Sequence, residues 1–207
     1  MDITIIGTGN MARAIATRAL AGGHTVTLVG TETAKAQALA DQLSGDVRAG
    51  QGGDPLTGEV VVLAIWYAAL DDVLGRYRDQ LDGKVVVDIT NPIDVDTFEP
   101  LKLEAGSAAQ EIAARAPGAK VVKAFNTTFA GTLVEGEVAG QPLDVLLASD
   151  DEEAKGTVSR IVADAGLRTI DAGPLRRARE VEALGYLHMA IQQPLNTNFG
   201  STVKVLA

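Results

Sequence analysis

The sequence predicts an α/β fold with a doubly wound, mostly parallel sheet that is followed by a C-terminal helical element. A short apolar run at residues 3–6 ends in the glycine-rich turn GTGNMA, and an alanine-rich segment without internal Gly or Pro follows it. Along the rest of the chain, apolar runs rich in β-branched residues alternate with segments of good helix propensity. Such alternation, with mostly short connections, is typical of helices packed on both faces of one sheet.

The turn at residues 7–12 matches the dinucleotide-binding pattern G-x-G-x-x-G/A of Rossmann-type sheets, with Ala12 as its third small residue. Gly7 permits the tight turn, and Gly9 has no side chain to hold a pyrophosphate away from the backbone. The following helix directs its free N–H groups and the positive end of its dipole at that anion. A glycine turn that merely joins a strand to a helix is the alternative, and the strand–turn–helix context favours dinucleotide binding.

The same alternation sets the other expected elements. Strands are expected at residues 3–6, 24–29, 59–65, 84–90, 120–125, 143–148 and 166–170, the last one at the edge of the sheet. Helices are expected at residues 11–21, 34–43, 68–80, 103–116, from 150 onward and 175–192. Residues 49–58, rich in Gly and Asp, are predicted to form a connection.

Composition excludes several classes of function. The net charge is -9 and the pI about 4.7, so neither nucleic acid nor a membrane surface is expected as a partner. Cysteine is absent and only two histidines occur, which leaves little material for a metal site or a nucleophilic triad. We therefore predict no metal and no catalytic acid, base or nucleophile. The opening residues lack a basic-then-apolar signal pattern, and we expect a cytoplasmic location.

The segment after the second strand bears on the choice of cofactor. NAD-specific sheets usually carry a carboxylate at the end of this strand, where Gly30 stands here. Thr31 and Thr33 are expected to cap the next helix, and Lys35 lies in its first turn. Together they favour NADP(H) over NAD(H), because they can hold a 2′-phosphate. Glu32 opposes this choice, and a solvated helix face is the alternative for Glu32 and Lys35.

Two further strand ends carry candidate residues. Trp66 and Tyr67 follow the strand at 59–65, where the carboxyl ends of parallel strands line the ligand crevice. They either bracket the dinucleotide or pack over the top of the sheet. Asn91 and Pro92 follow the strand at 84–90, and Pro92 is expected to end that strand and shape the crevice floor.

Four segments resemble a known family. IGTGNMARA, VVVDITNP, VVKAFNTTFAGTL and DAGPLRRAREVEAL resemble the NADP oxidoreductases that reduce the deazaflavin coenzyme F420. The resemblance extends over nearly the whole chain, and its KAFNT and DAGPL segments are the most specific. It implies a hydride passed directly between nicotinamide and a planar small-molecule acceptor stacked on it, and it favours a homodimer. Such chemistry needs little acid–base machinery.

The resemblance also implies roles for residues. It places the pyrophosphate against Gly7, Thr8, Gly9, Asn10 and Met11. It places Thr31 and Lys35 at the 2′-phosphate, and Ile65, Trp66, Asn91 and Pro92 along the ribose and nicotinamide. It places the acceptor beside Asn126, Thr127, Pro174 and Leu175. On this basis we predict one NAD(P)-binding domain over residues 1–207, in which residues 171–207 form a C-terminal helix and tail that help build the acceptor pocket.

Several alternatives stay open at this point. Arg176, Arg177 and Arg179 either face an anionic acceptor tail or pair with neighbouring acids such as Glu180 and Glu182. A reductase of another electrophile (a flavin, C=O or C=N) would need a proton donor, for which Tyr67, Tyr186 and His188 are the candidates. A sensor that binds the dinucleotide without turnover is a third possibility. The apolar stripe of the C-terminal helix is either core packing or half of a dimer interface.

Overall fold

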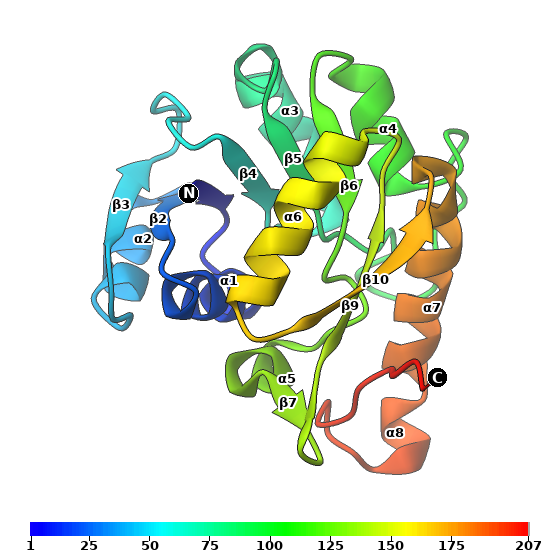
Figure 1. Cartoon of the computed structure of the whole chain (residues 1–207). Coiled ribbons are helices and arrows are strands. Elements are labelled where there is room, and N and C mark those ends of the chain that lie inside the picture. The colour runs from blue at the N-terminus through cyan, green and yellow to red at the C-terminus, as the bar shows by residue number, and fades with distance from the viewer. Residues whose placement is uncertain (207) are drawn as a thin grey trace.

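The computed structural model describes residues 1–206, in which eight strands form one sheet in the order β10-β9-β6-β5-β4-β1-β2-β3 (Figure 1). All neighbouring pairs in this sheet are parallel except β6 and β9. A separate two-stranded hairpin pairs β7 with β8. The strands are β1 (Asp2–Ile6), β2 (Thr25–Gly30), β3 (Val47–Gln51), β4 (Val60–Leu63), β5 (Val85–Asp88), β6 (Lys120–Lys123), β7 (Glu137–Val138), β8 (Gln141–Pro142), β9 (Asp144–Ala148) and β10 (Arg168–Gly173).

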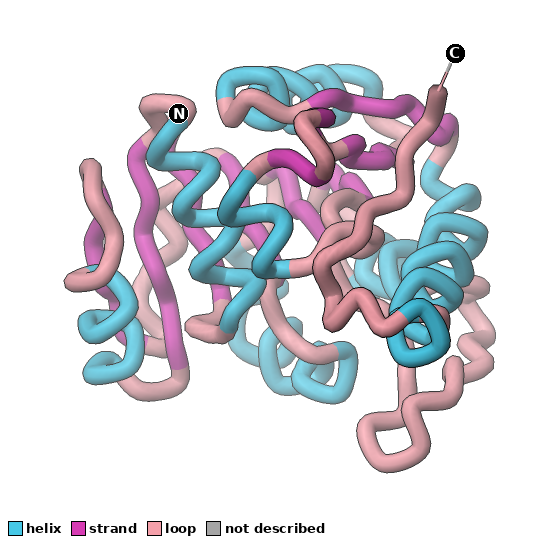
Figure 2. Tube along the Cα trace, turned by 90° about the horizontal axis from the view of Figure 1, so that it is seen from below, coloured by secondary structure: helices cyan, strands magenta, loops and turns pink. Residues whose placement is uncertain are grey.

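Helices connect most of these strands and form layers on both sides of the sheet (Figure 2). The α-helices are α1 (Asn10–Ala21), α2 (Thr33–Ala40), α3 (Leu70–Tyr77), α4 (Ala108–Arg115), α5 (Ala130–Glu135), α6 (Glu152–Asp164), α7 (Ala178–Ala190) and α8 (Gln192–Leu195). Short 3-10 turns are η1 (Tyr67–Ala69), η2 (Arg78–Gln80) and η3 (Leu175–Arg177). In residues 1–206 no helix has the length and apolar character needed to cross a bilayer.

The central strands are buried on both faces, which is why they read as continuous apolar runs. Successive side chains of a strand point to opposite faces. In β4, Val60 and Val62 therefore join a core cluster with α1, α2, α5 and α6, whereas Val61 and Leu63 join a second cluster with α3, α4 and the start of α7. The predicted α/β architecture is thus confirmed.

The order of strands creates a crevice beside β1. From β1 the chain crosses to β2 on one side, and later it enters β4 on the other side. Helices after β1 and β4 therefore lie on opposite faces, and their starts diverge at the carboxyl ends of the strands. Ligands of open α/β sheets bind at such a point.

The structure adds elements that we did not predict and changes others. Residues 49–58 were expected to form a connection, yet β3 occupies residues 47–51 as an edge strand whose residues are all at least partly exposed. The expected caps of α2 are wrong, because the N-cap is Glu32 and no side chain caps this helix. The α5 helix and the β7–β8 hairpin were not expected, and the helix expected at 68–80 is divided into η1, α3 and η2.

A buried carboxylate holds the C-terminal tail against the sheet. Asp144 is 1% exposed and accepts bonds from Arg168 Nε at 2.7 Å and Nη2 at 2.6 Å. Lys204 Nζ lies 2.7 Å from it, and the N–H of Val205 donates to it at 2.8 Å. Burial alone would raise the pKa of Asp144, but these four donors hold that pKa well below its usual range. Asp144 thus joins β9, β10 and the tail (red in Figure 1).

Asp144→Asn removes this charge, and we expect it to lower the free energy of unfolding at pH 7 by about 1–3 kcal/mol, since Arg168 is partly exposed. The folded-state pKa of Asp144 is depressed, so its stabilisation is present above the unfolded pKa of about 4 and is lost as pH falls below it. The difference between wild type and variant should therefore shrink from pH 7 to pH 3. Urea unfolding of both proteins at pH 7 and at pH 3 measures this difference. Asp79→Asn, at an exposed position, is the control; an unchanged difference at pH 3 would contradict the assignment.

Candidate functional site

A cleft of about 950 Å³ opens at the carboxyl ends of β1, β4, β5 and β6. The glycine turn between β1 and α1 borders it on one side, and residues that follow β6 border it on the other. Its walls are mostly apolar, with a few polar groups near the sheet. A concave, apolar site with few polar groups is the usual form of a small-molecule site.

The glycine turn has the conformation that its pattern predicts. Gly7 has φ +125°, and its N–H donates to Val29 O at 2.8 Å. A Cβ at Gly7 would lie 2.1 Å from the carbonyl oxygen of Ala64, which follows β4. A Cβ at Gly9 would meet no atom within 4 Å. The chain is therefore tightly packed at Gly7, while the space above Gly9 is open to the cleft.

The start of α1 is free to bind an anion. Its N-cap is Gly9, which makes no side-chain capping bond, and its first turn contains no acidic residue. The first N–H groups of a helix have no partner within the helix. Asn10 and Met11 of this turn line the cleft, so unpaired donors and the positive end of the helix dipole lie beside its open part.

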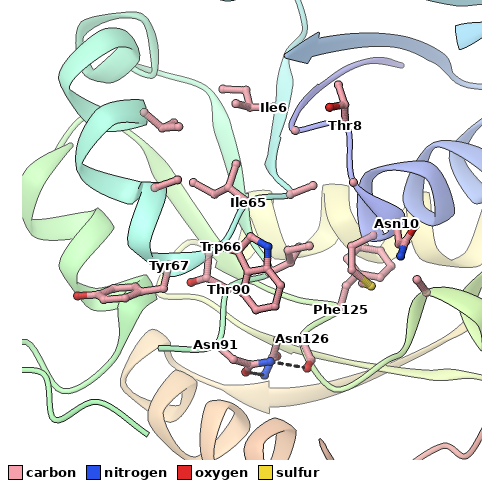
Figure 3. A pocket seen from close by; sticks show the side chains of 18 of the residues that line it. Ile6, Thr8, Asn10, Ile65, Trp66, Tyr67, Thr90, Asn91, Phe125 and Asn126 are labelled. Atoms are coloured by element: carbon pink, nitrogen blue, oxygen red, sulfur yellow. Dashed lines mark hydrogen bonds between the residues drawn. The ribbon is translucent and has the colours of Figure 1, made fainter. Parts of the chain in front are cut away.

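A pair of asparagines forms a polar corner below Trp66 (Figure 3). Asn126 Nδ2 donates to Asn91 Oδ1 at 3.0 Å, and Asn91 Nδ2 donates to Asn126 O at 3.1 Å. Asn126 Nδ2 also donates to Val181 O of α7 at 2.9 Å. Two buried oxygens here have no hydrogen-bond partner in residues 1–206, namely Asn126 Oδ1 and Thr90 Oγ1. Both residues line the cleft, so these oxygens have unused hydrogen-bonding capacity beside it.

A fully buried ion cluster lies beneath this corner. Lys123 Nζ is 2.7 Å from Asp88 Oδ2 and 2.8 Å from Glu182 Oε1, and it also donates to Thr90 O. Glu182 accepts the N–H of Ala108 at the start of α4. Burial would lower the pKa of Lys123, but the two carboxylates outweigh it and raise that pKa. Burial raises the pKa of Glu182. The cluster joins β5, β6, α4 and α7.

Aromatic side chains from the second half of the chain form the far wall. Phe129 stacks on His188 with ring centroids 4.3 Å apart, and Phe199 meets Phe129 edge-on at 5.0 Å. His188 Nδ1 lies 3.1 Å from Thr127 O, and Nε2 lies 2.9 Å from Ser201 Oγ. Burial lowers the pKa of His188. The imidazole thus links α7 and the tail to the cleft wall as a neutral group.

These features fit a nicotinamide dinucleotide. The open space above Gly9 and the uncapped helix suit a pyrophosphate. The unpaired Thr90 and Asn126 oxygens, in the same cleft, suit the amide of a nicotinamide or the polar edge of an acceptor. In the part of the chain that the structure describes, no group of three or more His, Cys, Asp or Glu residues is arranged to hold a metal ion.

Comparison with known proteins agrees with this geometry. Residues 2–92 match the model of the family described as NADP oxidoreductase coenzyme F420-dependent. An F420-dependent NADP reductase of Methanothermobacter thermautotrophicus is 31% identical over 202 residues, which cover 89% of this chain and 86% of that protein. The chain belongs to the family of coenzyme F420-dependent NADP oxidoreductases. It is therefore an NAD(P)-dependent oxidoreductase.

Two further relatives of this family member are informative. The metalloreductase STEAP3 of Rattus norvegicus is 34% identical over 185 residues, which cover 88% of this chain but only 36% of STEAP3. The chain thus spans about a third of the length of that relative. The crystal structure of a candidate F420-dependent NADP reductase from Arthrobacter sp. FB24 superposes with a TM-score of 0.86 at 28% identity and covers 99% of both chains.

The structure brings most of the predicted site residues of this oxidoreductase into one cleft. Those that line it are Gly7, Thr8, Gly9, Asn10, Met11, Thr31, Ile65, Trp66, Tyr67, Asn91 and Asn126. Those outside its lining are Thr33, Lys35, Pro92, Thr127, Pro174 and Leu175. Leu175 is 5% exposed and packs in the core with α3 and α4, and Lys35 lines a separate shallow hollow behind the glycine turn.

The three arginines after the GPL turn do not line the cleft. Arg179 Nε donates to Glu180 Oε1 at 2.6 Å, and Arg177 Nη1 lies 3.9 Å from the same oxygen. These contacts favour pairing with neighbouring acids over contact with an acceptor. Glu182 instead pairs with the buried Lys123.

Several lining residues were not predicted from the sequence. They come from α3 (Val73, Arg76 and Tyr77), from the segment after β6 (Phe125, Thr128 and Phe129) and from the C-terminal region (Met189 and Phe199). No sequence signal marks Phe125, and its unusual turn, with a positive φ of 59°, is visible only in the structure. The others become neighbours of the cleft only through tertiary packing.

The three candidate proton donors are engaged elsewhere. Tyr67 donates to Glu111 Oε2 at 2.7 Å and points away from the asparagines (Figure 3). Burial and Glu111 together raise the pKa of Tyr67 to about 12. Tyr186 donates to Glu99 at 3.1 Å, and both ring nitrogens of His188 have partners.

The two glycines of the turn should differ in their effect on folding. Gly7→Ala places a Cβ against Ala64 O at positive φ, and we expect a loss of about 2–4 kcal/mol in the free energy of unfolding. Gly9→Ala adds its Cβ to open space, and we expect a change below about 1 kcal/mol. Urea unfolding of both variants measures the difference. Equal losses would show that the turn is not packed as described.

Lys123→Met should destabilise the fold strongly, because it leaves Asp88 and Glu182 as unpaired buried carboxylates. We expect a loss of about 3–5 kcal/mol in the free energy of unfolding. Adding Glu182→Gln to this variant should restore part of the lost free energy of unfolding. Lys120→Met on the same strand is the matched control, since its pair with Glu153 is exposed to solvent and contributes little to stability. Denaturant unfolding that gave equal losses for the two lysines would rule out a stabilising role for the cluster.

Proposed function

We propose that this protein transfers a hydride between NADP(H) and the deazaflavin coenzyme F420. One observation carries the proposal: a single continuous cleft combines a dinucleotide-type glycine turn at one end with an apolar, aromatic wall at the other. Family membership supports the reaction type, and the names of the methanogen relatives support the acceptor.

In this proposal the first half of the chain holds the cofactor. The pyrophosphate lies on the free N–H groups of α1, against Gly7, Thr8 and Gly9. The adenosine extends toward Thr31 at the end of β2. The nicotinamide extends toward Ile65, Trp66 and the asparagine corner, where Thr90 Oγ1 and Asn126 Oδ1 have unused hydrogen-bonding capacity.

The second half of the chain forms the acceptor side. We assign this side to Asn126 and to the apolar groups of Phe129, Met189 and Phe199, so that the C-terminal region contributes to the pocket through its described residues, 171–206. Pro174 and Leu175, which the sequence placed at the acceptor, would act here by supporting the start of α7. A planar ring has apolar surface to stack on in such a wall.

In this reaction the side chains mainly have to position the two reacting rings. Reduced nicotinamide supplies a hydride, and the oxidised deazaflavin takes up that hydride together with one proton from solvent. The protein must hold two rings in contact and exclude water from between them. The engagement of Tyr67, Tyr186 and His188 with other partners favours a deazaflavin, which takes its proton from solvent, over a C=O or C=N substrate, which would need a positioned proton donor.

A second acceptor class has support from one relative. The metalloreductase STEAP3 matches 88% of this chain at 34% identity, so a metal-linked electron acceptor is an alternative to coenzyme F420, besides the flavin that the sequence left open.

We also propose a homodimer. Leu187 on α7 is 55% exposed and Phe98 is 57% exposed, in contrast to Val181 on α7, which is buried in the core. Part of the apolar stripe of α7 is therefore available for a second copy of the chain. The mass of the protein in solution, measured by light scattering, decides this point.

The proposal predicts bleaching of the deazaflavin absorbance when oxidised coenzyme F420 is mixed with NADPH and the protein. We expect a rate at least tenfold higher with NADPH than with NADH. Gly9→Ala, which should fold normally, is expected to weaken NADPH binding about tenfold or more by blocking the pyrophosphate. Ala130→Gly, at the edge of the cleft opposite the turn, serves as a matched small-residue control.

Absence of bleaching with NADPH binding intact would exclude the deazaflavin and direct attention to flavins and ferric complexes, which are tested in parallel. Tight NADPH binding with no turnover on any acceptor would instead identify a sensor.

A further inference from the structure

Arg76 of α3 lies across the adenosine end of the cleft from the end of β2. A Cβ at Gly52 would lie 2.7 Å from Arg76 Nη1, 2.9 Å from Gly30 O and 3.6 Å from Thr31 Cα. The guanidinium and the Gly30–Thr31 backbone thus border the same point in space, which is empty because residue 52 has no side chain. All four residues line the cleft.

This guanidinium has no fixed task in the fold. Within residues 1–206 no carboxylate lies within 4.0 Å of it, whereas its neighbour Arg78 pairs with Asp79 at 3.1 Å. Arg76 is exposed and does not contribute to a core cluster. Among the cleft-lining residues that the structure describes, it is the one cation. In a chain of net charge -9, a lone cation at a ligand cleft calls for an explanation.

Lys35, the cation that the sequence predicted at the 2′-phosphate, is placed less well than Arg76 to bind a ligand in the cleft. Lys35 Nζ lies 2.6 Å from Glu32 Oε1, and Lys35 does not line the cleft. Its ammonium neutralises the one carboxylate that would repel a phosphate at this loop. The hydroxyl-bearing Thr31 does line the cleft, at the position where dinucleotide-binding sheets contact the adenosine ribose.

We propose that Arg76 selects NADP(H) over NAD(H) by binding the 2′-phosphate between its guanidinium and Thr31. The inference rests on the proposed use of a nicotinamide dinucleotide. A planar guanidinium binds phosphate oxygens in a two-pronged manner, and an arginine near the end of β2 is a known way to accommodate the 2′-phosphate. Gly52 is required for this arrangement, because any side chain there would occupy the space in front of the guanidinium.

Asp72, one helical turn before Arg76, is the carboxylate on this side of the cleft. It does not pair with Arg76, and it sits one turn away from the phosphate position. Its negative charge moderates the attraction, so we expect the contribution of Arg76 to be that of one charge-assisted hydrogen-bonding group, about tenfold to a hundredfold in affinity.

The test measures dissociation constants of NADPH and NADH for wild type, Arg76→Gln, Arg76→Lys, Lys35→Gln and Arg78→Gln by calorimetry, without any acceptor. Adenosine 2′,5′-bisphosphate and 5′-AMP serve as probes of the adenosine end alone. We expect Arg76→Gln to weaken NADPH and the bisphosphate at least tenfold and to change NADH and 5′-AMP less than twofold. Arg76→Lys should recover part of the loss, and Arg78→Gln should match wild type.

Equal weakening of NADPH and NADH by Arg76→Gln would overturn the proposal and assign the guanidinium to the adenine ring. A selective loss in Lys35→Gln but not in Arg76→Gln would overturn it in favour of Lys35. Wild type that bound neither dinucleotide would remove both this inference and the proposed function. Selective loss in Arg76→Gln, combined with failure to reduce coenzyme F420, would support Arg76 and reject only the acceptor.

Discussion

The arrangement of the cleft depends on one buried interaction, the contact of Lys123 with Asp88 and Glu182. Two strand ends and the C-terminal helix α7 meet at this ammonium, directly below Thr90 and the asparagine corner. Burying three charges costs free energy unless each finds close partners, so the cluster tolerates few alternative positions for α7. The cleft wall formed by the second half of the chain is thereby held in register with the glycine turn of the first half.

Close backbone contacts complement this charge cluster. Gly7 lets the first turn approach Ala64, and Gly185 lets α7 approach Asn126 and Asn91, since a Cβ there would lie 2.8 Å from Asn126 O and from Asn91 Oδ1. Gly7 thus brings a turn, and Gly185 a helix, closer to a neighbouring strand end than a side chain would allow. The cleft is therefore shaped by residues that lack side chains as much as by those that have them.

The sequence predicted the sheet well because its central strands are buried on both faces and read as unbroken apolar runs. It did not reveal β3, since an edge strand that contains Arg48 and Gly50 has no such run. The candidate residues next to strand ends, such as Asn91 and Asn126, lie in the cleft as parallel topology requires. Arg76 and Phe199 could not be found this way, because their place depends on how a helix and a tail pack.

Trp66 is the one tryptophan in the sequence, and it is 62% exposed at the cleft. Its indole lies over Thr90 and the asparagine corner in Figure 3. A ligand that fills the cleft must change the polarity around this ring, and reduced nicotinamide absorbs in the region where tryptophan emits. The protein thus contains its own optical reporter of occupancy, which needs no label and has no second indole to obscure it.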